Sequence, residues 1–227
     1  MNKILVIAAH SDDETLGMGA TIARHVANKD EVRLITMTDG VSARETPNHG
    51  NSPHDSERLT SLQQAAKTLG ISKVYSFNFP DNKMDSIALL DVIKVIEGVI
   101  SKYLPSIIYT HSSCDLNIDH LTTHKAVMTA CRPQPSSTVK SIFCFEVRSA
   151  TEWQSNSMAQ FTPNYFVDIT DFIEIKMTAL DCYKQELREY PHSRSKKALE
   201  AHAISRGTSV GYSYAEAFFI ERMLQSK

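Results

Sequence analysis

Two clusters of polar residues, each directly after a short and mainly apolar run, hold the side chains best suited to chemistry. The first covers residues 10–14 (HSDDE) and the second covers residues 111–120 (HSSCDLNIDH). Two imidazole nitrogens and one carboxylate, with water in the open position, form a catalytic zinc arrangement, and a neighbouring carboxylate could take a proton from that water. The alternative is that Asp12 or Asp13 only caps the helix that follows. The two clusters together favour the metal site.

The elements expected before these clusters place them side by side. Residues 3–9 (KILVIAA) and 106–110 (SIIYT) are typical of strands buried on both faces of a parallel sheet. A helical pattern from residue 15 and a second buried strand at 32–37 complete a βαβ unit. Ligands of open α/β sheets bind outside the carboxyl ends of the strands, so both clusters should face one crevice.

The whole pattern predicts one domain over residues 1–227, with an α/β fold of the Rossmann-like three-layer type and a mainly parallel sheet. Residues 41–56 predict a long loop. Gly70 should end the helix expected at 56–69. Further expected elements are helices at 56–69, 87–103, 120–131 and 172–189, strands at 74–79, 141–147 and 165–169, and a tail at 195–224 built of a helix, a glycine-containing loop and a second helix.

Composition and charge exclude several classes of protein. The 227 residues carry 24 Lys and Arg against 26 Asp and Glu, a net charge of −2, so no basic surface for nucleic acid is expected. With 42% hydrophobic residues, the chain is too apolar for long disorder. No run reaches the ~18 apolar residues of a membrane span, and the first run leads into acidic residues instead of a signal-peptide cleavage site. We therefore expect a cytoplasmic protein, in which four widely spaced cysteines are free thiols: Cys114, Cys131, Cys144 and Cys182.

The first cluster, with Ala9 before it, is similar to the A-H-P-D-D-E motif of the PIG-L / LmbE-like zinc-dependent N-deacetylases. The similarity extends to residues 38–40, 79–82, 119–120 and 214–218. Residues 115–120 resemble the corresponding motif of a bacterial branch of the family, which acts on sugar intermediates of surface-polysaccharide synthesis. The resemblance implies that zinc is the cofactor and that His10, Asp13 and His120 hold it. It also implies that Asp12 is the general base and that Asp119 orients its neighbours.

Two departures from the family motif bear on the mechanism. Ser11 stands where the family usually has proline, which should change the stiffness of the loop and keep the ligands. Asn117 stands where many relatives carry a histidine that assists the tetrahedral intermediate. Asparagine can donate a hydrogen bond to an oxyanion but cannot protonate a leaving amine. The general acid is therefore open between Asp12 acting twice, His111, His192 and another residue.

Charged residues elsewhere are weaker candidates for substrate binding. Arg58, Asp81 and Arg194 could bind sugar hydroxyls or phosphate, and arginine suits phosphate because its planar fork can donate two hydrogen bonds. Asp85, Arg148 and Arg206 are the remaining members of this group. His124 lies one helical turn after His120 and is expected at most beside the site. Glu216 belongs to the family resemblance, and its role does not follow from the sequence.

The sequence supports two hypotheses from different classes. The first is a zinc hydrolase that removes acetate from an N-acetylated amino sugar or its nucleotide-, lipid- or thiol-linked conjugate, in polysaccharide or glycoconjugate biosynthesis. The second is a non-catalytic sugar- or nucleotide-binding module on the same fold. Dinucleotide binding is weakly supported, because Gly17 and Gly19 lie inside the expected helix and form no G-x-G-x-x-G motif. The expected partner is a small sugar substrate, and homo-oligomer formation is left open.

Overall fold

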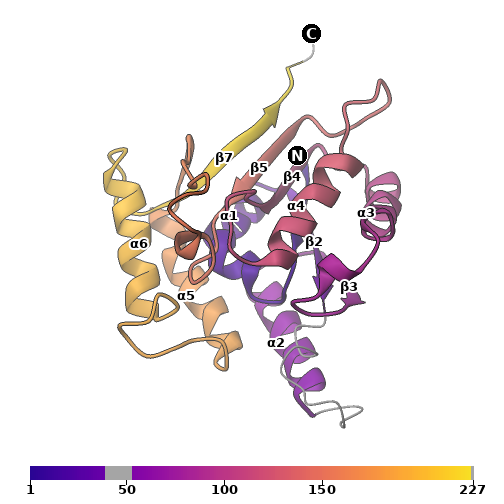
Figure 1. Cartoon of the computed structure of the whole chain (residues 1–227). Coiled ribbons are helices and arrows are strands. Elements are labelled where there is room, and N and C mark those ends of the chain that lie inside the picture. The colour runs from indigo at the N-terminus through magenta and orange to yellow at the C-terminus, as the bar shows by residue number, and fades with distance from the viewer. Residues whose placement is uncertain (39–52, 226–227) are drawn as a thin grey trace.

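A seven-stranded sheet forms the centre of the molecule in the computed structural model, which describes residues 1–38 and 53–225, without the side chains of 53–56 (Figure 1). The strand order is β3-β2-β1-β4-β5-β7-β6. The first five strands in this order are parallel, and β7 runs antiparallel to both β5 and β6. The strands are β1 (Lys3–Ala8), β2 (Glu31–Thr38), β3 (Lys73–Phe79), β4 (Ile107–His111), β5 (Ser141–Phe145), β6 (Tyr165–Asp168) and β7 (Ala215–Met223).

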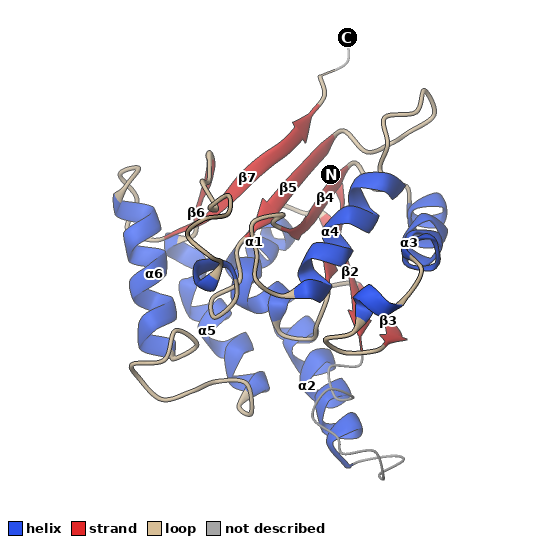
Figure 2. Ribbon diagram, viewed as in Figure 1, coloured by secondary structure: helices blue, strands red, loops and turns tan. Residues whose placement is uncertain are grey.

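Helices cover both faces of the sheet (Figure 2), and the side chains of β1 show why. Ile4 and Val6 pack into a core shared with α1, α2, α5 and α6, whereas Leu5 and Ile7 pack into a core shared with α3 and α4. A strand that is apolar at successive positions buries both faces in this way. The predicted three-layer α/β sandwich is confirmed. The helices are α1 (Asp13–Ala27), α2 (Pro53–Leu69), α3 (Leu89–Tyr103), α4 (Ile118–Ala130), α5 (Ile173–Leu180) and α6 (Lys196–Thr208).

The predicted helix ends agree best with the structure where a glycine or a proline follows the helix. Helix α2 ends at Leu69, and Gly70 follows with φ of +78°, a conformation that glycine adopts without steric cost. Helix α3 ends at Tyr103, two residues before Pro105. The start of α2 at Pro53 shortens the loop predicted for 41–56, most of which lies outside the described residues.

The helix predicted over 172–189 is wrong in its second half. Helix α5 ends at Leu180, and a short 3-10 helix (Asp181–Tyr183) leads into turns. The turns bring Tyr183 and Glu186 to partners far away in sequence: the Tyr183 hydroxyl donates to Glu14 Oε1 at 2.8 Å, and Glu186 Oε1 accepts from Arg58 Nη1 at 3.0 Å. Long-range polar contacts thus replace the last helical turns.

The second helix predicted for the tail is also wrong, because that segment is strand β7. Alanine, glutamate and methionine in this segment favour a helix. The strand nevertheless lies between β5 and β6, where Phe218 is fully buried. Packing in the sheet therefore overrides local propensity, as it commonly does for strands.

Helix α1 is interrupted at Met18, whose φ of −152° is not helical. The interruption frees the carbonyl oxygen of Leu16, which accepts from Lys176 Nζ at 2.8 Å, and the N–H groups of Ala20 and Thr21, which donate to the Glu216 carboxylate at 3.2 and 2.7 Å. Lys176 and Glu216 are buried and form an ion pair at 2.6 Å. The ion pair therefore satisfies backbone groups on both sides of the interruption, which gives Glu216 a structural role.

No helix in the described part of the chain is long and apolar enough to cross a membrane.

Candidate metal and catalytic site

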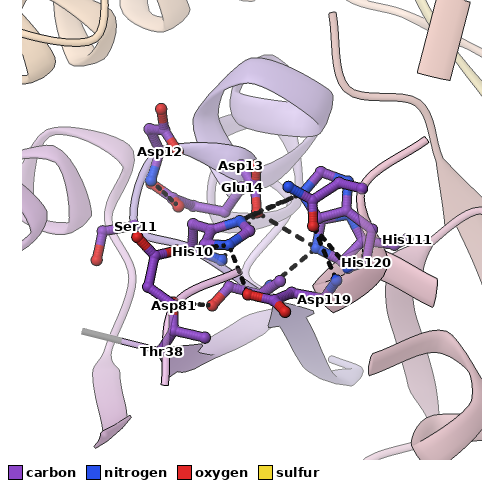
Figure 3. Close-up of polar contacts among 12 residues, drawn as sticks. His10, Ser11, Asp12, Asp13, Glu14, Thr38, Asp81, His111, Asp119 and His120 are labelled. Carbon is purple, nitrogen blue, oxygen red and sulfur yellow. Dashed lines mark hydrogen bonds and ion pairs between the residues drawn. The ribbon is translucent and has the colours of Figure 1, made fainter. Parts of the chain in front are cut away.

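The two polar clusters meet at one edge of the sheet because β1 and β4 are adjacent and parallel, with Ile4 paired to Ile107 and Ile7 to Thr110. His10 follows β1, and Asp13 is the first residue of α1. His120 lies in the first turn of α4 and points toward His10 and Asp13 (Figure 3). The structure thus brings His120 to His10 and Asp13, which lie more than a hundred positions before it in the sequence.

His10, Asp13 and His120 present three ligand atoms in a compact triangle. Asp13 Oδ2 lies 3.1 Å from His10 Nδ1 and 3.2 Å from His120 Nε2, and the two nitrogens are 3.3 Å apart. Zinc with ligands at about 2.0–2.1 Å in a tetrahedron requires ligand atoms roughly 3.3 Å from one another. Asp13 Oδ1 is buried and has no hydrogen-bond partner among the described residues. Both the donor set and its spacing therefore fit a divalent metal such as zinc.

The outer nitrogens of both histidine rings contact carboxylates. His10 Nε2 lies 3.1 Å from both Asp119 Oδ2 and Asp81 Oδ1, and His120 Nδ1 lies 3.0 Å from Asp115 Oδ1. Carboxylates in this position fix the orientation of a metal-binding imidazole and make it a better ligand. The contacts with the histidines support the orienting role expected for Asp119 and indicate the same role for Asp115 and Asp81.

These carboxylates are held in turn by neighbouring groups. Asp119 accepts from the backbone N–H groups of Asn82 at 2.6 Å and Met84 at 3.0 Å, and Asp115 Oδ2 accepts from Thr151 Oγ1 at 2.7 Å. The side chains of Asp115 and Asp119 are fully buried. The loop after β3 and the segment after β5 therefore help to fix the candidate ligands.

Asp12 turns away from the triangle. Its φ of +120° is unusual for a residue with a side chain, and its backbone N–H donates to Glu14 Oε2 at 3.1 Å. Asp12 Oδ2 lies 3.1 Å from Arg194 Nη1. Burial raises the pKa of Asp12 to about 7, against the lowering effect of the Arg194 guanidinium. A carboxylate with a pKa near neutrality is well suited to exchange a proton with water.

The structure gives Asn117 a second task. Its Oδ1 accepts from the backbone N–H of Asp119 at 2.8 Å, which caps α4, and its Nδ2 donates to Asn82 Oδ1 at 3.0 Å. Because the amide nitrogen carries two hydrogens, one remains for a ligand. Asn117 thus positions the helix that carries His120 and can still donate to an oxyanion.

The other histidines near the site, of which His111 and His192 are the candidate proton donors, occupy different places. His111 stacks on His120 with ring centroids 3.9 Å apart, and its Nε2 accepts from the Ala9 N–H at 2.8 Å. Burial holds the pKa of His111 well below its usual value, so a neutral, packed ring is favoured. His124 Nδ1 lies 2.9 Å from the carbonyl oxygen of His111 and is absent from the triangle. His192 Nδ1 accepts from the Arg194 N–H at 3.0 Å.

Of the three residues predicted to bind substrate, Arg194 contacts Asp12, Arg58 contacts the residue before it, and Asp81 lies against His10. Arg58 is buried, pairs with Glu186, and donates from Nη2 to the carbonyl oxygen of Ser11 at 3.3 Å. A cavity of about 220 Å³ lies beside this arginine, and its walls include Ser11, Thr36, Thr38, Arg58, Ser76 and Asn78. The weaker candidate Arg206 instead binds Glu146.

Sequence reasoning missed three residues that support this site. Ser149, Tyr183 and Glu186 contact Arg194, Glu14 and Arg58, respectively. Serine, tyrosine and glutamate are common at surfaces and in loops, and no local motif distinguishes these three. Their partners lie 45 to 169 positions away, so only the fold reveals the contacts.

Comparison with known proteins finds similarity to several that are named deacetylases. A family model described as PIG-L: GlcNAc-PI de-N-acetylase matches residues 5–131. The uncharacterized deacetylase YaiS of Escherichia coli (strain K12) is 31% identical over 189 residues, which cover 80% of this chain and 90% of the relative. The diacetylchitobiose deacetylase of Thermococcus kodakarensis is 26% identical over 227 residues, or 95% of this chain and 82% of the relative.

A solved structure shows the same fold. The N,N'-diacetylchitobiose deacetylase from Pyrococcus horikoshii, in complex with its inhibitor MPG, aligns with a TM-score of 0.77. The alignment covers 97% of this chain and 84% of the other, at 23% sequence identity. The similarity therefore extends over nearly the whole chain, including the antiparallel strands beyond the residues matched by the family model.

Proposed function

The chain belongs to the PIG-L family of GlcNAc-PI de-N-acetylases, and from this premise we propose that it is a metal-dependent hydrolase that removes the acetyl group from an N-acetylated amino sugar or its conjugate. The observation that carries the proposal is the buried triangle of His10, Asp13 and His120 with Asp12 beside it. The names of two relatives, one acting on diacetylchitobiose and one on a 2-acetamido-2-deoxy-glucopyranoside of inositol, support a sugar substrate.

Zinc is the proposed cofactor, held by His10 Nδ1, Asp13 Oδ2 and His120 Nε2. Bound there, it would polarise the acetyl carbonyl and lower the pKa of water toward ~7. The outer contacts of His10 and His120 with Asp119 and Asp115 keep the inner nitrogens directed at the metal position.

Asp12 is the proposed general base. It takes a proton from water as the water oxygen bonds to the acetyl carbon, and the carbonyl becomes an oxyanion to which Asn117 can donate through its remaining Nδ2 hydrogen. The carbon–nitrogen bond then breaks, and the amine nitrogen must receive a proton, because an amide anion is too poor a leaving group. A protonated Asp12 can return that proton, so one residue serves both steps and the products are acetate and a free amine.

The remaining assignments concern substrate recognition, domain organisation and cellular role. We place substrate recognition at Arg58 and Asp81, which contact Ser11 and His10 beside the candidate metal position. We also propose that residues 1–227 act as one deacetylase domain in polysaccharide or glycoconjugate biosynthesis. The cytoplasmic location stays a prediction, consistent with four cysteines that form no disulfide.

The experiment that tests the proposal measures metal content and acetate release on the same preparation. The purified protein should contain about one zinc ion per chain. It should release acetate from N-acetylglucosamine or N,N'-diacetylchitobiose, lose that activity on dialysis against a chelator and regain it with added zinc. The rival hypothesis, a sugar-binding module without catalysis, predicts sugar binding that survives the chelator and no acetate from any N-acetyl sugar.

A further inference from the structure

The side chain of Arg194 contacts the proposed base rather than pointing freely into the substrate region. Its Nη1 donates to Asp12 Oδ2 at 3.1 Å. The Asp12 side chain is only 3% exposed, against 21% for Arg194. We propose that Arg194 is a positioning residue that holds the Asp12 carboxylate in its working orientation. The proposal rests on the proposed function, since it concerns the residue to which that function gives the proton transfer.

Arg194 is itself held at several points. Its Nε donates to Ser149 Oγ at 2.5 Å and lies 3.4 Å from the carbonyl oxygen of Arg148. Its backbone N–H donates to His192 Nδ1, and the next residue, Ser195, caps α6 by accepting from the Ala198 N–H at 3.2 Å. The guanidinium is thus fixed between the segment after β5 and the start of α6, as a positioning group requires.

Glu186 links Arg194 to a second arginine, Arg58, which contacts the backbone next to Asp12. Glu186 Oε2 lies 3.7 Å from Arg194 Nη1, and Glu186 Oε1 lies 3.0 Å from Arg58 Nη1. Arg58 Nη2 donates to the carbonyl oxygen of Ser11, the residue before Asp12. Arg194 therefore holds the side chain of Asp12, while Arg58 holds the backbone just before it, and the charges along this path alternate in sign.

Orientation matters at Asp12 because a general base has to face the water from which it takes a proton. A proton acceptor must lie within hydrogen-bond reach of the proton it takes, and a displacement of about 1 Å can cost roughly 100-fold in rate. The competing assignment is that Arg194 binds the substrate directly. The two assignments differ in whether the effect of Arg194 depends on the presence of the Asp12 carboxylate.

A double-mutant cycle with zinc-loaded protein and N,N'-diacetylchitobiose separates the assignments. Arg194→Gln should lower kcat about 10- to 100-fold, with KM and zinc content within about 2-fold of the parent. In an Asp12→Asn background the same change should lower kcat by less than about 3-fold, because the carboxylate to be positioned is gone. Arg188→Gln, an exposed arginine on the same segment, is the matched control and should leave kcat unchanged.

The outcomes are distinguishable from failure of the proposed function. A raised KM with unchanged kcat, or equal losses in both backgrounds, would overturn the positioning role in favour of direct substrate binding. If the parent protein releases no acetate at all, the function fails, and the positioning role is decided by crystal structures of the parent and Arg194→Gln. The Asp12 carboxylate should rotate from its place in the variant, and an unmoved carboxylate would refute the proposal.

Discussion

Asp12 and Asp13 are adjacent in the chain, yet their carboxylates have entirely different neighbours. Asp13 Oδ2 lies between two histidine nitrogens at 3.1 and 3.2 Å, whereas Asp12 Oδ2 lies 3.1 Å from the Arg194 guanidinium. The φ of +120° at Asp12 turns the backbone so that the two side chains diverge. The HSDDE motif thus presents one carboxylate to two histidines at the candidate metal position and the other to an arginine.

We predict that substitutions at these two positions separate metal binding from turnover. Asp13→Ala removes a ligand atom, so zinc per chain should fall severely, with activity falling as a consequence. Asp12→Asn keeps shape and removes basicity, so zinc content should stay near normal while kcat falls about 10²–10⁴-fold. Metal analysis and acetate release on both variants check this. Equal zinc loss in both, or wild-type turnover in Asp12→Asn, would contradict it.

A second prediction concerns the ion pair that joins the two parts of α1. Lys176→Met leaves the Glu216 carboxylate buried without its cation and the Leu16 carbonyl without its donor, so the free energy of unfolding should fall by roughly 3–5 kcal/mol. Urea denaturation measures the change. The double variant Lys176→Met/Glu216→Gln removes the stranded charge and should be more stable than Lys176→Met alone. A loss below about 1 kcal/mol in Lys176→Met would show that the pair contributes little.

Gly17 should be intolerant of even a methyl group. A Cβ at this position would lie 2.5 Å from Phe145 Cδ2 and 3.1 Å from the Glu146 carbonyl oxygen, so Gly17→Ala should destabilise the protein by about 1–3 kcal/mol. Gly98, in α3, is the matched control because a Cβ there meets nothing within 4 Å. Gly98→Ala should stabilise by about 0.5–1 kcal/mol. Urea midpoints of both variants test the pair, and similar effects of the two substitutions would contradict the packing argument.

Glu146 should make the free energy of unfolding depend on pH in the acid range. Burial alone would raise the pKa of Glu146, but His202 and Arg206 lower it to about 2, below the ordinary value of 4.5. A lowered folded pKa gives stability that is fully present above pH 4.5 and is lost as the pH falls toward 2, by at most roughly 3 kcal/mol. The difference in unfolding free energy between wild type and Glu146→Gln, measured by urea from pH 7 to 2.5, should therefore shrink below pH 4.5. A difference that stays constant over this range would refute the prediction.

Much of the N-terminal half could be predicted because its signals are local. The apolar run before His10 indicates a strand buried on both faces, and parallel pairing of β1 with β4 then brings His10 near His120. The contacts of Arg194 and Glu216 could not be predicted, because they join residues 182 to 196 positions apart through packing of the last third of the chain. The same packing turns residues 215–223 into a strand despite their helical propensity.

The interruption of α1 has a consequence for how the protein is made. The helix is encoded within the first 27 residues, but its open backbone groups are completed by Lys176 and Glu216, near the other end of the chain. A nascent chain that has emerged only as far as residue 131 carries every proposed zinc ligand and lacks both of these partners. On the ribosome, where synthesis proceeds from the N-terminus, these backbone groups of α1 therefore lack their partners until residue 216 has been translated.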